Sequence, residues 1–144
     1  MIEYELDQLP FLTAEIPGIG GQVKQTADDF VVEEIPLYRP TGQGEHLFVT
    51  LRRSNMTTRC VQQKLAELFQ IDPAQIGYAG MKDRIARVTQ TFSIPGATVS
   101  LAGWIESKLG LEVLDARPHH NKLRLGHLAG NHFEILIRLR PDEI

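Results

Sequence analysis

The chain alternates two kinds of apolar repeat, and their order constrains its fold more than any other feature. Residues 46–52 place Leu or Val at every second position, which is the pattern of a β-strand with one buried face. Residues 57–69 instead repeat apolar side chains at intervals of four and three, which is the pattern of a buried helical stripe. Segments of both kinds follow one another, which predicts a sheet with helices packed against it.

The patterns predict five strands and two helices. The expected strands are residues 30–35, 46–52, 89–94, 111–116 and 132–139; the helices run over 57–69 and from Thr98 or Ser100 to Leu109, with a short helical turn starting at Asp72-Pro73. The Gly-rich loop after the first strand favours a hairpin with the second. The last strand is expected to turn its alternating apolar side chains inward: Phe133, Ile135, Ile137 and Leu139. We therefore expect an α+β fold with a mixed, largely antiparallel sheet and helices on one face.

Composition sets the class of protein. The 144 residues suffice for one domain with a core, and 42% hydrophobic with 23% charged residues is ordinary for a soluble globular protein. No apolar stretch has the length of a membrane helix, and the acidic N-terminus lacks the regions of a signal peptide. Cys60 is the only cysteine, which excludes an internal disulfide and a Cys-based zinc site, and we expect it to be a small buried hydrophobe. These features predict a cytoplasmic protein.

Charge is unevenly distributed along the chain. Residues 1–36 hold eight acids, with Glu3, Glu5 and Asp7 among them, and one base, whereas the remainder carries a net charge of +4. Residues 117–140 hold five bases, one acid and four of the five histidines. Such asymmetry can create a nucleic-acid-binding face on a protein of low pI, although the same charges can also merely solvate a surface.

The segment around Asp83 has the strongest chemical character. It follows Gly80, lies between Lys82 and Arg84, and precedes a β-prone run, so we expect its carboxylate on a turn that leads into a strand. The two flanking cations are expected to favour the ionised carboxylate, which could act as a nucleophile, a general base or a metal ligand. The alternative is a surface turn with ordinary ion pairs.

Two further segments are rich in polar and aromatic residues. In residues 24–34, Phe30 is either a core residue or an exposed stacking platform. Residues 117–133 combine cations, amide and imidazole donors, two glycines and an aromatic residue, a mixture that suits phosphate and base contacts. The four histidines of this region lack a spacing that would bring them together on a metal, so no metal site is expected.

Four motifs follow one another along residues 16–140. They are Lys24-Gln25-Thr26 with Asp29-Phe30-Val31-Val32-Glu33-Glu34, Gly42-Gln43-Gly44-Glu45-His46, Gly77-Tyr78-Ala79-Gly80-Met81-Lys82-Asp83-Arg84 with Ala86, Thr89 and Gln90, and Lys122-Leu123-Arg124 with Gly126-His127-Leu128-Ala129-Gly130-Asn131-His132-Phe133. In this order they resemble the TruD family of tRNA pseudouridine synthases. The departure from the family pattern is Arg87-Val88, where the family usually has Val or Cys followed by Thr.

The resemblance implies an isomerase that converts uridine to pseudouridine in tRNA, at position 13 in bacterial members, without cofactor or metal. The reaction requires the base to leave the helical stack. Whether Asp83 attacks ribose C1′ or assists formation of a glycal stays open. The implied site residues are Asp83 as nucleophile, Arg84 beside it, Phe30 and Asn131 lining the uridine pocket, Phe133 near that pocket, Lys24 as a basic residue, and Lys122 and Arg124 on RNA phosphates.

The resemblance also implies a longer protein. Residues 1–144 would be the N-terminal part of the catalytic domain, whose inserted family-specific domain and C-terminal half are absent from this chain and would be partners of it; we expect this polypeptide alone to be inactive. One alternative is a non-catalytic RNA-binding module that keeps the uridine pocket. Another is an Asp-dependent enzyme that acts on small substrates.

Overall fold

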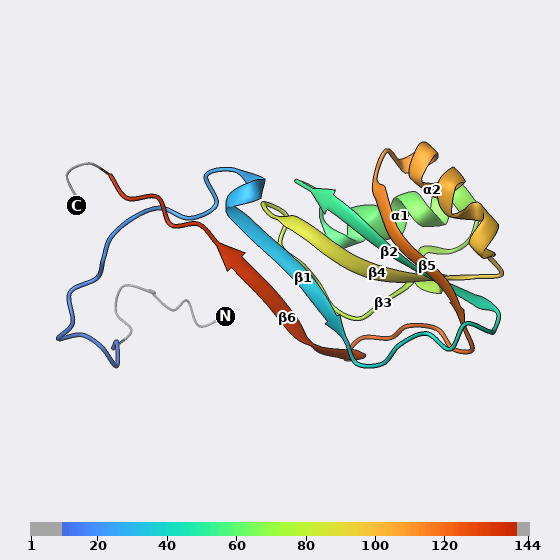
Figure 1. Cartoon of the computed structure of the whole chain (residues 1–144), viewed down its shortest axis with the longest axis horizontal. Coiled ribbons are helices and arrows are strands. Elements are labelled where there is room, and N and C mark those ends of the chain that lie inside the picture. Colours follow the sequence, from blue (N-terminus) through green and yellow to red (C-terminus); the bar gives the residue numbers. More distant parts are fainter. Residues whose placement is uncertain (1–9, 141–144) are drawn as a thin grey trace, which may run out of the picture.

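A computed structural model describes residues 10–140, which form one mixed sheet with two helices (Figure 1). The acidic residues Glu3, Glu5 and Asp7 lie outside the described residues. The strands are β1 (Phe30–Pro36), β2 (His46–Ser54), β3 (Gly77–Tyr78), β4 (Arg87–Pro95), β5 (Glu112–His119) and β6 (Leu128–Ile135); the helices are α1 (Thr58–Phe69) and α2 (Ala102–Leu109), and short 3-10 turns are Ala27–Asp29, Pro73–Gln75 and Val99–Leu101.

The sheet has the order β5-β2-β4-β1-β6, with β3 paired to β4 beside this path. The β1–β4 pair is parallel, and the remaining pairs are antiparallel. Both helices cover β2, β4 and β5, whereas β1 and β6 extend beyond them (Figure 1). The expected α+β class with a mixed, largely antiparallel sheet and helices on one face is confirmed.

The predicted hairpin between the first two strands is wrong, because β4 lies between β1 and β2. The connection of residues 37–45 is long enough to pass over a neighbouring strand, and it packs on the end of β5. There the Gly42 N–H donates to the Pro118 carbonyl at 3.0 Å. Gly44 has φ +128°, and a Cβ there would lie 2.3 Å from the His119 backbone, so only glycine fits this crossing.

The hydrophobic core lies between the helices and the sheet, as the sequence patterns predict. Helix α1 begins after Thr57, whose side chain accepts from the Cys60 N–H at 3.1 Å, and α2 ends at Gly110 in the left-handed conformation. Cys60 itself is only partly buried. The fully buried core comprises Leu47, Val49, Leu51, Val61, Leu65, Ala66, Ile76, Phe92, Ile94 and Ile105.

The last strand differs from its prediction. It covers Leu128–Ile135 rather than residues 132–139. Its apolar side chains are not buried inward: Phe133 is 49% exposed, Ile135 47%, Ile137 45% and Leu139 44%. The reason is that β6 is an edge strand, and neither helix reaches over it (Figure 1). Alternation identified a strand here, but alternation cannot tell whether another layer covers it.

Candidate active site

The Asp83 carboxylate lies beside Lys24, which connects it to two aromatic rings. Its Oδ1 is 2.9 Å from Lys24 Nζ, and the two side chains are 44% and 31% exposed, respectively. The same ammonium lies 4.1 Å from the centre of the Phe30 ring, a cation–π contact. Phe30 in turn meets Phe133 edge to face, with ring centroids 5.9 Å apart. Four residues predicted from the sequence therefore form one continuous row.

Lys24 reaches this place through an unusual backbone conformation. Its φ of 58° lies in the left-handed region, which costs a non-glycine residue about 1–3 kcal/mol. The segment is held nearby by a pair of hydrogen bonds between Gln22 and Arg138, each 2.9 Å long. Strain of this kind concentrates at functional sites, so it supports a role for Lys24 beyond surface charge.

The backbone of the Asp83 loop is fixed by buried polar side chains. The Gln90 amide donates to the Gly80 carbonyl at 2.7 Å, and the Thr58 hydroxyl accepts from the Lys82 N–H at 3.0 Å. Both of these side chains are fully buried. Helix α1 and strand β4 therefore both hold the part of the loop that precedes Asp83.

Arg53 completes this network from the end of β2. Its guanidinium donates to the Thr58 hydroxyl at 3.1 Å, to the Gln90 carbonyl oxygen at 3.2 Å and to the Met56 carbonyl, and it lies 3.4 Å from the Asp83 carbonyl. Burial lowers the pKa of Arg53 to about 10, so the guanidinium still carries its charge at neutral pH. A buried cation is thus placed directly beneath the catalytic candidate.

Lys82 does not pair with Asp83, contrary to the expectation from the sequence. Its ammonium turns into the sheet and lies 3.0 Å from Glu34 Oε2, and both side chains are nearly inaccessible, at 3% and 4% exposure. Burial raises the pKa of Glu34, an effect that the charge of Lys82 and a hydrogen bond from the Thr91 backbone oppose. Lys24 takes the place beside Asp83 that we expected Lys82 and Arg84 to fill.

Asn131 lies on β6, directly opposite Glu34 in the β1–β6 ladder. Its Oδ1 is buried and has no hydrogen-bond partner within the described residues. Phe133, two positions further along, projects from the same face of β6. A buried acceptor without a partner is costly, and a ligand with an N–H group would satisfy it.

The other predicted residues lie apart from this row. Arg84 is exposed and makes no hydrogen bond or ion pair with residues 10–140. Lys122 bonds the Ala74 carbonyl and, together with Arg124, lines a shallow hollow beside β3. No contact links Lys122 or Arg124 to Asp83 in the described part of the chain.

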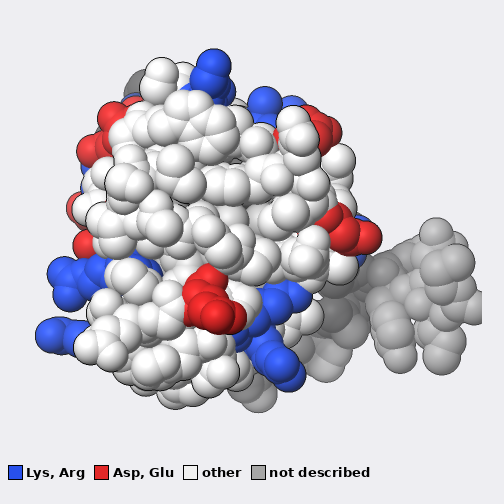
Figure 2. Space-filling model, turned by 90° about the vertical axis from the view of Figure 1, so that its right-hand side faces the viewer, with Lys and Arg blue, Asp and Glu red and all other residues white. Residues whose placement is uncertain are grey.

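The basic segment 117–140 does not act as one charged surface. Arg138 binds Asp29 through two hydrogen bonds of 2.7 Å, and Arg117 pairs with Asp115 at 3.0 Å. At the end of the molecule shown in Figure 2, acidic and basic side chains are interspersed. Arg117 and Arg138, two cations of this segment, are therefore already paired with carboxylates.

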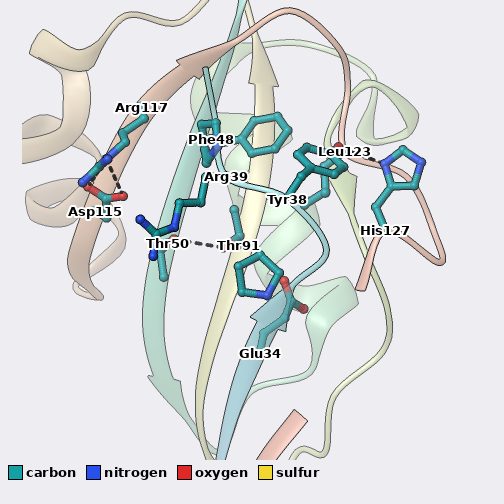
Figure 3. Close-up of a pocket in the computed structure, with 12 residues that line it drawn as sticks. Glu34, Tyr38, Arg39, Phe48, Thr50, Thr91, Asp115, Arg117, Leu123 and His127 are labelled. Atoms are coloured by element: carbon teal, nitrogen blue, oxygen red, sulfur yellow. Dashed lines mark hydrogen bonds and ion pairs between the residues drawn. The ribbon is translucent and has the colours of Figure 1, made fainter. Parts of the chain in front are cut away.

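A cavity of about 380 Å³ opens on the face of the sheet that points away from the helices (Figure 3). Phe48 and Thr50 line it and alternate along β2 with Leu47, Val49 and Leu51, which face the helices. Tyr38 lies at its edge, where its hydroxyl is 2.9 Å from His127 Nδ1. Asp83, Phe30 and Asn131 do not line this cavity, but Glu34 does, so the cavity borders the ion pair of Glu34 with Lys82.

Sequence reasoning missed the polar residues that support the loop. A signal was present, because Arg53 continues the inward alternation of Leu47, Val49 and Leu51, and Gln90 occupies an inward position between Val88 and Phe92. A polar side chain at an inward strand position requires partners. Read in that way, the alternation would have identified both Arg53 and Gln90.

No group of three or more His, Cys, Asp or Glu side chains in residues 10–140 is arranged to hold a metal ion. No helix of that region has the length and apolar character to cross a membrane.

Comparison with known proteins agrees with the geometry. The profile of the family described as tRNA pseudouridine synthase D (TruD) matches residues 8–143. The chain is 46% identical over 128 residues to tRNA pseudouridine synthase D of Geobacter metallireducens, covering 89% of this chain and 31% of that protein. It is 44% identical over 135 residues to the protein of the same name from Thermus thermophilus, covering 94% and 38%, respectively.

A solved structure also matches. It is that of a putative tRNA pseudouridine synthase D from Methanosarcina mazei, with a TM-score of 0.74 and 28% identity, covering 91% of this chain and 30% of that one. The chain spans about a third of the length of the curated relatives that it matches. By sequence motif, fold and the match to almost its whole length, the chain belongs to the TruD family of tRNA pseudouridine synthases.

Proposed function

We propose that this chain supplies the catalytic carboxylate and part of the uridine pocket for the isomerisation of uridine to pseudouridine in tRNA, at position 13. The observation that carries the proposal is the row Asp83–Lys24–Phe30–Phe133, in which one ammonium group joins the carboxylate to the Phe30 ring and that ring packs against Phe133. A carboxylate beside stacking platforms suits a base that has left the RNA helix. The proposed cellular compartment is the cytoplasm.

Each side chain has a defined part in the proposed reaction. The C1′–N1 bond of uridine breaks, the uracil rotates, and a C1′–C5 bond forms. C5 then loses its proton, and N1 gains one. Asp83 acts at C1′ as a nucleophile, or assists loss of a proton from the ribose if a glycal forms. Lys24 is the counter-ion of the carboxylate before substrate arrives.

The pocket residues hold the detached base. Phe30 and Phe133 offer ring faces and edges for stacking, worth about 1–3 kcal/mol per base. Asn131 Oδ1, which lacks a partner among residues 10–140, would accept from an N–H of the uracil. Arg84, Lys122 and Arg124, which are not bound to carboxylates in the described chain, would contact RNA phosphates.

We further propose that residues 1–144 form one part of a catalytic domain, with the remainder supplied by further sequence. The coverage of about a third of the relatives supports this. So does the edge strand β6, where Phe133 and Ile135 are each about half exposed, as is Leu136 directly after it. The isolated chain is then inactive.

The test uses tRNA labelled with tritium at C5 of uridine and the polypeptide encoded by the whole open reading frame. Release of tritium into water by wild type, and its loss in Asp83→Asn with RNA affinity kept, supports the proposal. No release of tritium from a tRNA with cytidine in place of uridine 13 supports position 13 as the modified nucleotide. Binding without any release would instead identify the non-catalytic RNA-binding alternative, and activity without RNA would identify an enzyme of small substrates.

A further inference from the structure

Glu34 and Lys82 form the most deeply buried ion pair among the described residues. Glu34 Oε2 and Lys82 Nζ are 3.0 Å apart, and the two side chains are only 4% and 3% exposed, respectively. Single surface pairs contribute little, but a buried pair must be well placed, because removing one partner leaves an uncompensated charge. The row that contains Asp83 and Phe30 does not include either residue, so the pair needs an explanation of its own.

Lys82 precedes Asp83 and anchors the loop from below. Its N–H donates to the Thr58 hydroxyl at 3.0 Å, while its side chain runs in the other direction into the sheet. A Cβ placed on Gly80 would lie 3.6 Å from Lys82 Nζ, so the ammonium packs directly under the turn. The position of the Asp83 Cα is therefore tied to the position of this ammonium.

Glu34 lies where β1 separates from β4. The parallel ladder pairs Val31–Glu33 with Arg87–Thr89, and Glu34 is the next residue. The backbone of Thr91, on β4, lies close enough to lower the pKa of the Glu34 carboxyl against the larger effect of burial. On its other side, Glu34 is paired with Asn131 in the ladder to β6. A single carboxylate thus contacts β4, lies opposite the pocket residue of β6 and binds the Asp83 loop.

We infer that the Glu34–Lys82 pair is a positioning device of the proposed site: it fixes the position of the Asp83 loop relative to β6, the strand that carries Asn131 and Phe133. This inference rests on the proposed function. Glu34 and Lys82 are positioning residues, because they act on the reacting groups through Asp83 and Asn131. A displacement of about 1 Å at such a site lowers turnover about 100-fold.

The decisive variant removes both charges at once. Glu34→Gln with Lys82→Met keeps the two side-chain volumes and leaves no lone buried charge, so folding stability should stay near that of wild type. If the pair only stabilises the fold, this double variant keeps full turnover. If the pair positions Asp83, turnover falls about 100-fold while the KM for tRNA stays within about threefold.

A matched control uses the exposed pair Arg52–Glu112, whose side chains are 39% and 53% exposed. The same exchange there, Arg52→Met with Glu112→Gln, should leave turnover unchanged. Glu34→Asp is a second test that keeps both charges and shortens the carboxylate by one carbon; it should lower turnover more than it lowers thermal stability. Wild-type turnover in the Glu34→Gln/Lys82→Met protein, or in Glu34→Asp should the double variant not fold, overturns the inference.

Hydrogen exchange separates this inference from the proposed function. Peptides covering residues 79–85 should exchange faster in the double variant than in wild type, while peptides of α1 should not change. Equal exchange of residues 79–85 in the two proteins overturns the positioning role, even if no RNA substrate is turned over. Failure of wild type to release tritium from tRNA overturns the proposed function instead, and the exchange result still decides the role of the pair.

Discussion

Asn131 lies opposite Glu34 across the β1–β6 ladder, and its side-chain oxygen is buried without a hydrogen-bond partner in the described chain. An unpaired acceptor of this kind costs about 1–3 kcal/mol in the unliganded protein. Nearby, Glu34 is engaged by Lys82, so it cannot donate to Asn131 in its ionised form. The strand therefore carries a destabilising group at a position where the proposed base would bind.

Replacing that group should separate stability from activity. We expect Asn131→Leu to leave the free energy of unfolding unchanged or to raise it by up to about 1 kcal/mol, because an unsatisfied acceptor is removed. Turnover of tRNA should be lost. Urea unfolding and the tritium assay check the two effects, with the exposed Asn121→Leu as control. A large loss of stability in Asn131→Leu would show that the amide has a structural partner.

The Lys24–Asp83 pair should matter for turnover rather than for stability. A partly exposed pair contributes about 0–1 kcal/mol to folding, so Lys24→Met should shift the unfolding free energy by less than that. Turnover should fall by at least about tenfold, which corresponds to about 1.4 kcal/mol of barrier, because the carboxylate loses its counter-ion. Lys64→Met, on the exposed surface of α1, is the control. Equal turnover in the two variants would contradict a role for Lys24.

Acid stability should depend on Asp29. Hydrogen bonds from the Arg138 side chain lower the pKa of Asp29 to about 2 from an ordinary 3.8. Because the folded pKa is the lower one, this stabilisation is present above pH 3.8 and is lost as pH falls towards 2. Asp29→Asn removes that dependence, so its melting temperature should fall less steeply than that of wild type between about pH 4 and 2. Melting temperatures that fall equally with pH in wild type and in Asp29→Asn would contradict this role of Asp29.

His119 should make the loop before β2 sensitive to mild acid. Burial, followed by the charges of His120 and His46, lowers the pKa of His119 from 6.5. Its Nδ1 accepts from the Thr41 N–H at 3.3 Å, so the neutral ring is the bound form. Since the unfolded chain takes up the proton more readily, stability declines as pH falls below 6.5. Hydrogen exchange at residues 37–45 should increase at pH 5 in wild type and respond less to pH in His119→Asn.

The edge strand should govern self-association of the isolated chain. Ile135 is 47% exposed on β6, whose outer edge has no strand beside it among the described residues. We expect Ile135→Lys to reduce concentration-dependent association in sedimentation experiments, whereas Val99→Lys, at a similarly exposed position away from the edge, should not. Identical association in the two variants would rule out the edge as the contact.

The sequence predicted most elements because their patterns are local. Repeats of period two and of three to four, together with caps at Thr57 and Gly110, located the strands and helices well. Pairing was less accessible: the supposed hairpin of β1 and β2 failed because nothing within either segment reveals that β4 separates them. Which strands become neighbours in the sheet depends on contacts between distant segments, and the residue pattern within one segment does not reveal those contacts.

The candidate site shows the same division. The motifs identified Asp83, Phe30, Phe133 and Lys24, and the structure brings these four into one row. They did not reveal which cation would face Asp83, because Lys82 is adjacent in sequence but its side chain turns away. Neighbours in sequence have neighbouring backbones. The partner of a long side chain, however, depends on where its charged end reaches an opposite charge in the folded protein.

The short ladder between β1 and β4 has a dynamic consequence. Only three residue pairs join these strands, whereas seven pairs join β1 to β6, so the two outer strands are attached to the helix-covered part of the sheet by a narrow seam. Across this seam the buried side chains of Val32 and Val88 pack together, and the Glu34–Lys82 pair joins β1 to the Asp83 loop. Opening the seam would expose that cluster and separate a buried ion pair, so β1 and β6 are expected to move together with the rest of the sheet rather than independently of it.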